Sequence, residues 1–334
     1  MKLKRIIISR VDSIGDVMLT LPLTGVIKKH IPDAEIIFLG KSYTQSIIES
    51  CSHVDQFVNW DNIKSAEDKV DQFKLLQADT IIHVLPNIQV AALAQRARIK
   101  NRIGTSRRWF HHLYCNKLVS LSRRKSELHE AQLNIKLITD LLNVVVPDLA
   151  ELPDFYGFNS RVPLKEEFKT LLALHPKNII LHPKSQGSAR EWGLKNFDEL
   201  IQLFAKEDVG VFITGTADEG KLIQHGLTLD GTNVYNMTGK MDLTQLISFI
   251  QSCDGLLAAS TGPLHIAAAL GKRTVGLYSP LKPIYPARWG ALGKNTINLT
   301  YEGPLDLGVT VKTDHSMEKI KPQRVFHALM NPDS

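Results

Sequence analysis

Cysteine is scarce in this 334-residue sequence, and its three cysteines are not spaced to form a site. Cys51, Cys115 and Cys253 are odd in number, lie far apart and form no C-x-x-C pair. This pattern argues against both a disulfide framework and a zinc site. A reducing, cytoplasmic compartment is therefore the expected one.

Long apolar runs and a secretory leader are also missing. No stretch approaches the roughly 18 uninterrupted apolar residues that a membrane-spanning helix needs. Segment 1–8 enters a β-type run directly, without the apolar stretch and small-residue cleavage site of a signal peptide. Any membrane contact is therefore expected to be peripheral.

Three motifs of nucleotide and metal chemistry do not occur. The sequence contains neither the dinucleotide fingerprint G-x-G-x-x-G nor the phosphate loop G-x-x-x-x-G-K-[ST], which argues against a dehydrogenase and a P-loop NTPase. It also has no D-x-D pair, so no metal site is expected.

The composition is that of an ordinary globular protein, with 43% hydrophobic and 22% charged residues. The formal net charge of +6 favours anionic partners such as phosphates, acidic glycans or a charged membrane surface. Because the chain exceeds the roughly 250–300 residues at which single cores stop growing, two domains are expected.

Short apolar strands alternate with helical segments along the chain. Strands are predicted at 6–9, 34–39, 80–85, 178–182, 209–214, 255–259 and 273–278. Such alternation is typical of the α/β class, in which helices cover parallel sheets. It occurs on both sides of a Pro-rich polar stretch, 147–163, which we interpret as a linker with the domain boundary near residue 160. A final helix is predicted over 317–330 from its apolar spacing.

Ligands bind open parallel sheets at the carboxyl ends of the strands, so the turns that follow strands are candidate sites. In the first such turn, Gly15 permits a tight backbone and Asp16 precedes a helix predicted over 17–30. Asp16 could cap that helix or serve as a general base. Pro22 should kink or restart the helix, because proline fits only its first turn.

A second turn follows the strand predicted at 255–259. Ser260, Thr261 and Gly262 turn the chain, and Pro263 suits the first position of a helix. The free N–H groups and positive dipole at that helix start could hold a pyrophosphate. The alternative is a capped core helix in which His265 is a satisfied polar residue.

Four motifs, in this order along the chain, resemble glycosyltransferase family 9, whose best-known members are the ADP-heptose:lipopolysaccharide heptosyltransferases. They are D-S-I-G-D-V-M-L-T-L-P at 12–22, His129-Glu130 opening a helix, His182-Pro183 followed by Arg190-Glu191-Trp192, and S-T-G-P-L-H-I-A-A-A-L-G at 260–271. The resemblance implies a GT-B fold of two Rossmann-like domains whose parallel sheets face a central cleft. Residues 1–160 would bind the acceptor and 161–316 the nucleotide sugar, while a helix in 317–334 would cross back to the first domain.

The resemblance also implies an inverting, metal-independent sugar transfer. The proposed general base of the family falls on Asp16. The sugar donor would be a nucleotide diphosphate sugar, with ADP-heptose as the expected one. No separate cofactor is expected. The donor-binding positions that match the family are Ser185, Gln186, Arg190, Glu219, Met241, Ser260, Thr261, Gly262, Pro263, Leu264 and His265. Ser260 replaces an aspartate that many relatives carry, which makes heptose a less secure assignment than the reaction class.

The acceptor would be lipopolysaccharide or another lipid A-linked glycan, met at the inner face of the inner membrane. Residues 80–126 contain no Asp or Glu but ten Lys and Arg residues. Such a stretch could be solvated surface, a nucleic-acid footprint or a site for acidic sugars. We expect residues 102–125 to form a mobile loop over the acceptor at the membrane surface. The acceptor-binding candidates are Arg10, Ser13, Arg102, Arg107 and Arg108.

Two other classes of function stay open on the sequence. Another GT-B enzyme, such as a sugar-nucleotide epimerase or hydrolase, would turn over the donor without an acceptor. A non-catalytic protein that binds glycans or nucleic acid would not turn it over, and in the nucleic-acid case it would bind arbitrary duplexes in a salt-dependent manner.

Overall fold

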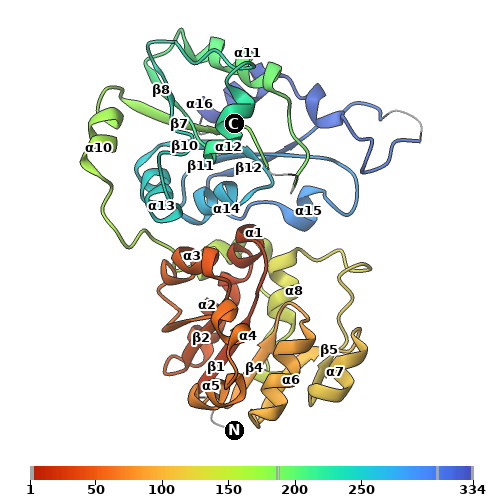
Figure 1. The fold of residues 1–334 in the computed structure, drawn as a ribbon. Helices are drawn as coiled ribbons and strands as arrows, with labels where there is room; N and C mark the ends of the chain where they lie inside the picture. The colour runs from red at the N-terminus through yellow and green to blue at the C-terminus, as the bar shows by residue number, and fades with distance from the viewer. Residues whose placement is uncertain (1–3, 186, 188, 306–307, 332–334) are drawn as a thin grey trace. The chain divides into compact units, whose positions relative to one another are not determined.

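The structure, a computed structural model, describes residues 4–185, 187, 189–305 and 308–331. It divides into two compact units, Met1–Phe158 and Asn159–Ser334 (Figure 1). Each unit contains one six-stranded parallel sheet with helices around it, so the α/β class predicted from the sequence is confirmed. Within the described residues, no helix is both long and apolar enough to span a membrane.

The sheet of the first unit has the strand order β3-β2-β1-β4-β5-β6. Its strands are β1 Arg5–Ser9, β2 Glu35–Gly40, β3 Gln56–Asn59, β4 Thr80–His83, β5 Asn101–Thr105 and β6 Lys117–Val119. The order is Rossmann-like, because the chain starts at the centre and fills first one side and then the other. Ile7, Ile37 and Ile81, from the three central strands, are fully buried in one core cluster.

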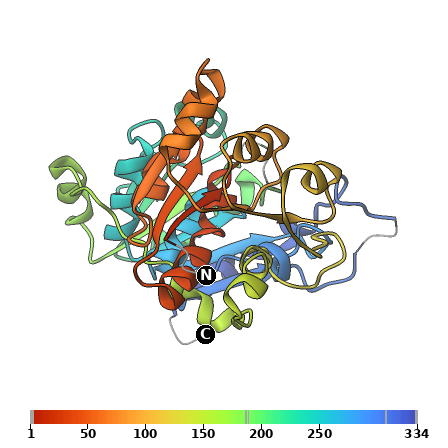
Figure 2. The ribbon, with the colours of Figure 1, turned by 90° about the horizontal axis from the view of Figure 1, so that it is seen from below.

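Helices flank this sheet, as the view from below shows (Figure 2). They are α1 Ile14–Met18, α2 Leu21–His30, α3 Gln45–Glu49, α4 Trp60–Ser65, α5 Lys69–Leu75, α6 Ile88–Arg96, α7 Trp109–Tyr114, α8 Glu130–Lys136 and α9 Thr139–Leu142, with 3-10 turns η1 Ser42–Thr44 and η2 Leu149–Phe155. The predicted effect of Pro22 is confirmed, since the helix expected over 17–30 ends at Met18 and restarts with Pro22 in the first turn of α2.

The sheet of the second unit repeats the pattern with the order β12-β11-β10-β7-β8-β9. Its strands are β7 Lys177–His182, β8 Val209–Ile213, β9 Val234–Asn236, β10 Gly255–Ala259, β11 Arg273–Tyr278 and β12 Thr296–Thr300. The helices are α10 Glu166–Leu172, α11 Leu194–Phe204, α12 Ala217–Ile223, α13 Leu243–Ser252, α14 Gly262–Ala269, α15 Pro286–Trp289 and α16 Pro322–Met330, with the 3-10 turn η3 Ser316–Lys319.

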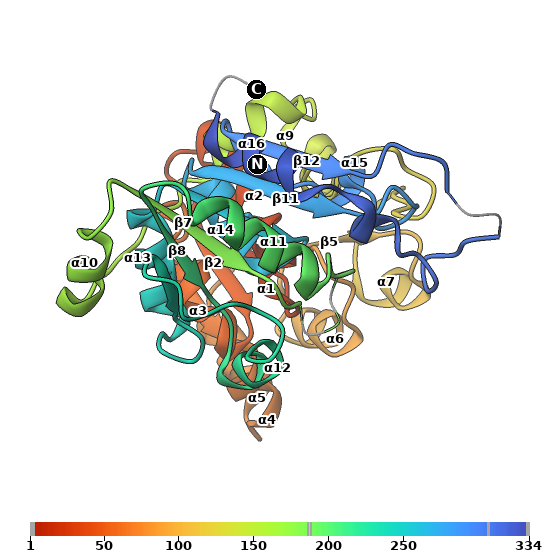
Figure 3. The same ribbon diagram turned by 90° about the horizontal axis from the view of Figure 1, so that it is seen from above.

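Helix α16 packs against α11 of the second unit (Figure 3). Val325, Ala328 and Leu329 form its buried face and belong to the second unit's core. The Arg273 guanidinium of β11 donates to the carbonyl oxygen of Ala328 at 2.6 Å. The sequence predicted this helix from its apolar spacing, and the crossing back to the first domain that the resemblance implied stays a prediction. In the structure the apolar face of α16 packs into the core of the second unit.

The stretch 147–163 is less of a linker than its composition suggested. Its first part forms η2, which packs against α2, with Leu152 and Tyr156 almost fully buried. The contact is close: a Cβ added to Gly25 of α2 would lie 2.2 Å from the carbonyl oxygen of Phe155. This segment therefore belongs to the first unit up to Phe158.

The expected mobile loop over 102–125 is also corrected. This segment contains most of β5, all of α7 and the edge strand β6. Backbone pairing of β5 with β6, from Ile103↔Lys117 to Thr105↔Val119, fixes it to the sheet. The sequence analysis did not predict these strands, because charged residues interrupt the apolar pattern by which strands are recognised.

Candidate functional site

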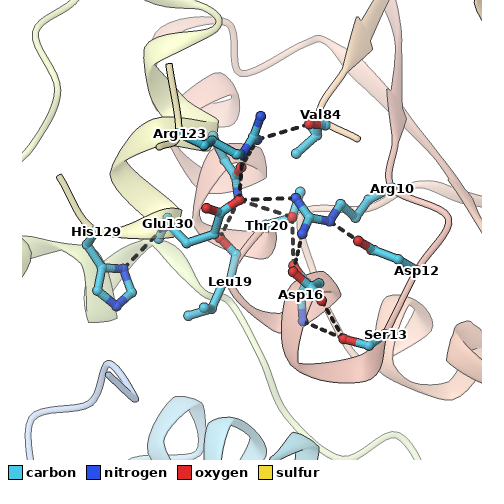
Figure 4. A network of polar contacts seen from close by, with 12 residues as sticks. Arg10, Asp12, Ser13, Asp16, Leu19, Thr20, Val84, Arg123, His129 and Glu130 are labelled. Carbon is cyan, nitrogen blue, oxygen red and sulfur yellow. Dashed lines mark hydrogen bonds and ion pairs between the residues drawn. The ribbon is translucent and has the colours of Figure 1, made fainter. Parts of the chain in front are cut away.

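Arg10 lies at the centre of a network of charged side chains where β1 ends (Figure 4). It follows the last residue of β1, and its backbone N–H donates to the Leu39 carbonyl oxygen at 3.1 Å, which fixes its position. The guanidinium is only 3% exposed and contacts three carboxylates: Asp12 at 2.8 Å, Asp16, and Glu130 at 3.3 Å. A buried cation is therefore fully surrounded by anions.

Glu130 joins this network to helix α8, which His129 caps. Its carboxylate is 1% exposed and also accepts from Nε of Arg123 at 2.9 Å. Arg123 in turn donates to the carbonyl oxygen of Val84 at 3.0 Å and to Asn134 at 2.9 Å. The segments after β1, after β4 and at the start of α8 are thus tied together around one cluster.

Asp16 is the third residue of α1, and Ser13 is the residue that caps this helix. The Ser13 hydroxyl accepts from the Asp16 backbone N–H at 3.4 Å and donates to the Asp16 carboxylate. Asp16 therefore does not serve as the N-cap, which removes the capping alternative. With 22% of its side chain exposed and two partners orienting it, Asp16 is an accessible, fixed carboxylate.

The cluster holds more acid than base. With every group ionised, Asp12, Asp16 and Glu130 contribute three negative charges against the two positive charges of Arg10 and Arg123. Burial raises the pKa of Asp12 to about 6; Arg10 opposes that rise and the charge on Asp16 adds to it. For Arg10 burial works to lower the pKa, but the three carboxylates outweigh it and raise the pKa above its usual value.

The remaining acceptor candidates lie outside this network. Arg102 has a structural role, because its guanidinium donates to the carbonyl oxygen of Tyr114 at 2.7 Å and to that of Ile99. Arg107 and Arg108 are exposed between β5 and α7. Of the predicted acceptor residues, the structure thus places only Arg10 and Ser13 beside Asp16.

Helix α14 of the second unit starts one residue before Pro263, the first position that the sequence predicted. Thr261 is its N-cap, and Gly262 and Pro263 are its first two residues. The backbone N–H groups of Gly262 and Leu264 lie in the first turn, where a helix offers them no internal acceptor. Thr261 Oγ1 is buried, and within the described residues it has no hydrogen-bond partner. His265 is also buried, and its N–H donates to the Thr261 carbonyl oxygen at 3.4 Å.

Polar residues also lie near the carboxyl ends of β7 and β11. The Ser260 side chain forms a hydrogen bond with the phenol of Tyr278. Burial raises the pKa of this phenol above its usual value. Ser185 is buried, and its hydroxyl donates to the Ala189 carbonyl oxygen at 2.9 Å. The Arg190 guanidinium donates to the carbonyl oxygen of Val311. Ser185 and Arg190 thus have partners in the protein that a donor would have to share or replace.

The last donor candidates have mixed outcomes. Glu219 closes a capping box with Thr216, whose backbone N–H donates to the Glu219 carboxylate at 2.7 Å, so this side chain caps helix α12. Met241 is half-buried, just before the Asp242 cap of α13. Gln186 lies outside the described residues.

Sequence reasoning missed several members of these clusters. Arg123 was counted with the basic residues of the loop expected over the acceptor, but its guanidinium binds Glu130. Tyr43 donates its hydroxyl to the Asp12 carbonyl oxygen at 2.6 Å, and Asp314 accepts from Ser279. No local motif marks these residues, because each meets its partner across 30 or more positions, except for Arg123, which is only seven from Glu130. In the part of the chain that the structure describes, no three His, Cys, Asp or Glu side chains are placed to hold a metal.

Two Rossmann-like units, one with a fixed carboxylate after β1 and one with a glycine-proline helix start, are the features expected of a GT-B glycosyltransferase. The family model for glycosyltransferase family 9 (heptosyltransferase) matches residues 72–315, and the chain belongs to this family. The resemblance seen in the sequence is thereby confirmed, and the protein is a glycosyltransferase.

Relatives match along most of the chain. A Haemophilus influenzae protein, named as a glycosyltransferase without a donor or an acceptor, is 29% identical over 302 residues, 86% of each chain. The lipooligosaccharide heptosyltransferase 2 of Campylobacter jejuni is 24% identical over 331 residues, 95% of each chain.

Solved structures establish the fold. A family 9 glycosyl transferase from Veillonella parvula has a TM-score of 0.78 at 20% identity, with 99% of this chain and 98% of that one covered. The Escherichia coli ADP-heptose lipopolysaccharide heptosyltransferase II has a TM-score of 0.77 at 20% identity, covering 99% and 100%. The GT-B fold expected from the sequence is confirmed by these neighbours.

Proposed function

We propose that this glycosyltransferase moves heptose from ADP-heptose to an inner-core lipopolysaccharide or related anionic glycan, with inversion and without a metal ion, on the cytoplasmic side of the inner membrane. Relatives and structural neighbours that bear the name heptosyltransferase support the choice of sugar. The observation that carries the proposal is Asp16, an accessible carboxylate held by Arg10 and Ser13.

In the proposed reaction, Asp16 accepts the proton of an acceptor hydroxyl as that oxygen attacks the anomeric carbon of the donor. The new C–O bond forms on the face opposite the nucleotide, so the configuration inverts as the bond to the diphosphate breaks. Arg10, with its charge balanced by carboxylates, keeps the Asp16 side chain in one orientation. This orientation matters because small misplacements of a reacting group cost large factors in rate.

The departing nucleoside diphosphate gains negative charge in the transition state. We assign its stabilisation to the N–H groups of Gly262 and Leu264 and to the positive end of the α14 dipole. The Thr261 hydroxyl, which has no hydrogen-bond partner among the described residues, is a further donor in the same turn. Arg190 would add a charged contact if it exchanged its bond to the Val311 carbonyl oxygen for one to phosphate.

The substitution Asp16→Asn tests the general base. It should leave donor binding unchanged and lower kcat for transfer by about 10²–10⁴-fold, the usual contribution of a positioned base. Asp71→Asn, at a carboxylate of the same unit with 70% of its side chain exposed, is the matched control and should transfer like the native enzyme. Full transfer by Asp16→Asn would exclude the proposed role.

Donor identity is tested separately, by thermal shift with ADP-, GDP-, UDP- and CDP-sugars. A bound donor raises the apparent stability by RT ln(1 + [L]/Kd), so ADP-heptose should give the largest shift. A larger shift with another nucleotide sugar would reject ADP-heptose and leave the reaction class in place. Transfer that persists in the presence of a chelator is expected, and its loss would reject metal independence.

A further inference from the structure

Helix α7 presents an apolar face that nothing in the described part of the first unit covers. Trp109 and Leu113 are four residues apart on this helix, hence on one side of it, and their exposed fractions are 69% and 58%. Residues of this size are seldom left exposed side by side in a soluble domain. This pair therefore needs a physical explanation.

The adjoining edge strand continues this face. Leu118 of β6 is 40% exposed and pairs in register with Gly104 of β5. In parallel strands, residues in register point to the same side of the sheet. A Cβ on Gly104 would point at His111 and Cys115, beside α7. Leu118 thus lies on the α7 side, and Trp109, Leu113 and Leu118 are called the α7 face below.

The helix that carries this face is firmly attached. His111 is fully buried, and its Nδ1 lies 2.9 Å from the Thr105 carbonyl oxygen. On the side of α6, Nε2 of Gln95 donates to the Leu113 carbonyl oxygen at 3.0 Å. The exposed side chains are therefore presented by a folded, anchored helix, not by a frayed segment.

The segment that carries the α7 face has charged side chains of one sign. Segment 80–126 contains no carboxylate side chain, and eight of its ten cations are exposed: Arg96, Arg98, Lys100, Arg107, Arg108, Lys117, Arg124 and Lys125. Within the described residues, no ion pair engages Arg107 or Arg108, which directly precede Trp109. Exposed aromatic and aliphatic side chains among unpaired cations are the features of a surface that lies on an anionic bilayer.

We propose that the α7 face is a membrane-contact surface, with Trp109, Leu113 and Leu118 entering the interface of an anionic bilayer and Arg107 and Arg108 contacting its headgroups. A protein partner would be expected to offer carboxylates and hydrogen bonds in a fixed arrangement, whereas a mixture of exposed cations and apolar side chains needs only an anionic surface with an apolar interior. The inference does not depend on the transfer reaction, because binding is measured without donor or acceptor.

Vesicle co-sedimentation of the full chain tests it, with phosphatidylcholine vesicles that either contain phosphatidylglycerol or lack it. The native protein should bind the anionic vesicles and lose binding as salt is raised, since screening weakens headgroup contacts. The double substitution Trp109→Ser/Leu113→Ser should weaken binding by about tenfold or more, because the interfacial side chains are lost. Leu75→Ser/Leu174→Ser, at two leucines that are 76% and 59% exposed, is the matched control and should bind like the native chain.

Tryptophan fluorescence gives a second readout. Trp60 and Trp192 are buried and Trp289 is half-buried, so Trp109 is the tryptophan most open to solvent. Its emission should shift to the blue on anionic vesicles and become protected from an aqueous quencher. Equal vesicle binding by native protein and the double variant, or an unprotected Trp109 on bound protein, would overturn the proposal. So would a concentration-dependent dimer that the double variant abolishes while vesicle binding persists.

Discussion

Replacing Glu130 by Gln should lower the free energy of unfolding of the first unit and slow transfer, although Glu130 contacts no substrate in the proposed reaction. The side chain is 1% exposed and binds two guanidinium groups, Arg10 at 3.3 Å and Arg123 at 2.9 Å. Gln keeps the size and one acceptor oxygen but removes the charge. Arg10, which is buried, would then have only Asp12 and Asp16 as counter-charges.

The size of the effect follows from burial. Removing one partner of a buried ion pair costs about 3–5 kcal/mol, because the other charge stays behind without compensation. Gln retains one acceptor, so the lower end, about 3 kcal/mol, is expected. That is a large part of the roughly 5–15 kcal/mol that stabilises a domain. With a urea m-value of about 2 kcal/mol per M, the midpoint should fall by about 1–2 M.

The assay is urea unfolding followed by circular dichroism, with Glu166→Gln as control. Glu166 undergoes the same chemical change, but it is 82% exposed and its ion pair with Lys169 should contribute well under about 1 kcal/mol. In transfer assays, kcat should fall while donor binding, assigned to the second unit, stays constant. Equal midpoints for Glu130→Gln, Glu166→Gln and native protein would refute the argument that Arg10 depends on Glu130.

Two further changes follow from the structure. Asp12 has a folded pKa of about 6 against 3.8 for the free group, so the folded state binds the extra proton between these values and gains stability as pH falls through this window. Asp12→Asn also removes a counter-charge of Arg10, so the test is the change of its relative stability with pH. Relative to native protein, the variant should be most stable near neutral pH and lose stability towards pH 4 in denaturant titrations; a relative stability that rises towards pH 4 would contradict the assignment. Gly25→Ala should lower the melting temperature, because the alanine Cβ would lie 2.2 Å from the Phe155 carbonyl oxygen and would push α2 away from η2. An unchanged melting temperature would show that the two elements can shift without loss of stability.

The sequence predicted the central strands well and the outer strands poorly. β10 and β11 were predicted with their observed bounds, because strands buried on both faces read as continuous apolar runs. β3, β5, β6, β9 and β12 were missed. Segments such as Q-F-V-N and N-R-I-G-T mix polar and apolar residues over only four or five positions, and their pairing with a neighbouring strand is what makes them strands.

The site divides in the same way. Arg10, Ser13 and Asp16 lie within seven residues, so a turn after a strand was enough to predict that they meet. Glu130 is 120 residues from Arg10, and only the fold of the intervening sheet brings α8 to the end of β1. Arg102 shows the reverse error, since its charge suggested a ligand while its guanidinium is bound to backbone carbonyl oxygens.

A buried charge cluster is an expensive way to hold one carboxylate, since apolar packing of similar volume is often more stable. The Ser13 hydroxyl alone could orient Asp16 within its own turn. Arg10 adds something Ser13 cannot, because it links the Asp16 carboxylate to Glu130 and hence to α8. Asn134 of the same helix donates to the Leu19 carbonyl oxygen at 3.0 Å, beyond the other end of α1. Helix α1 is thus held from both sides, and its position depends on α8 as much as on its own short sequence. Rigid support of this kind is what the proposed general base would require, and that requirement would account for charge at a place where stability alone favours apolar packing.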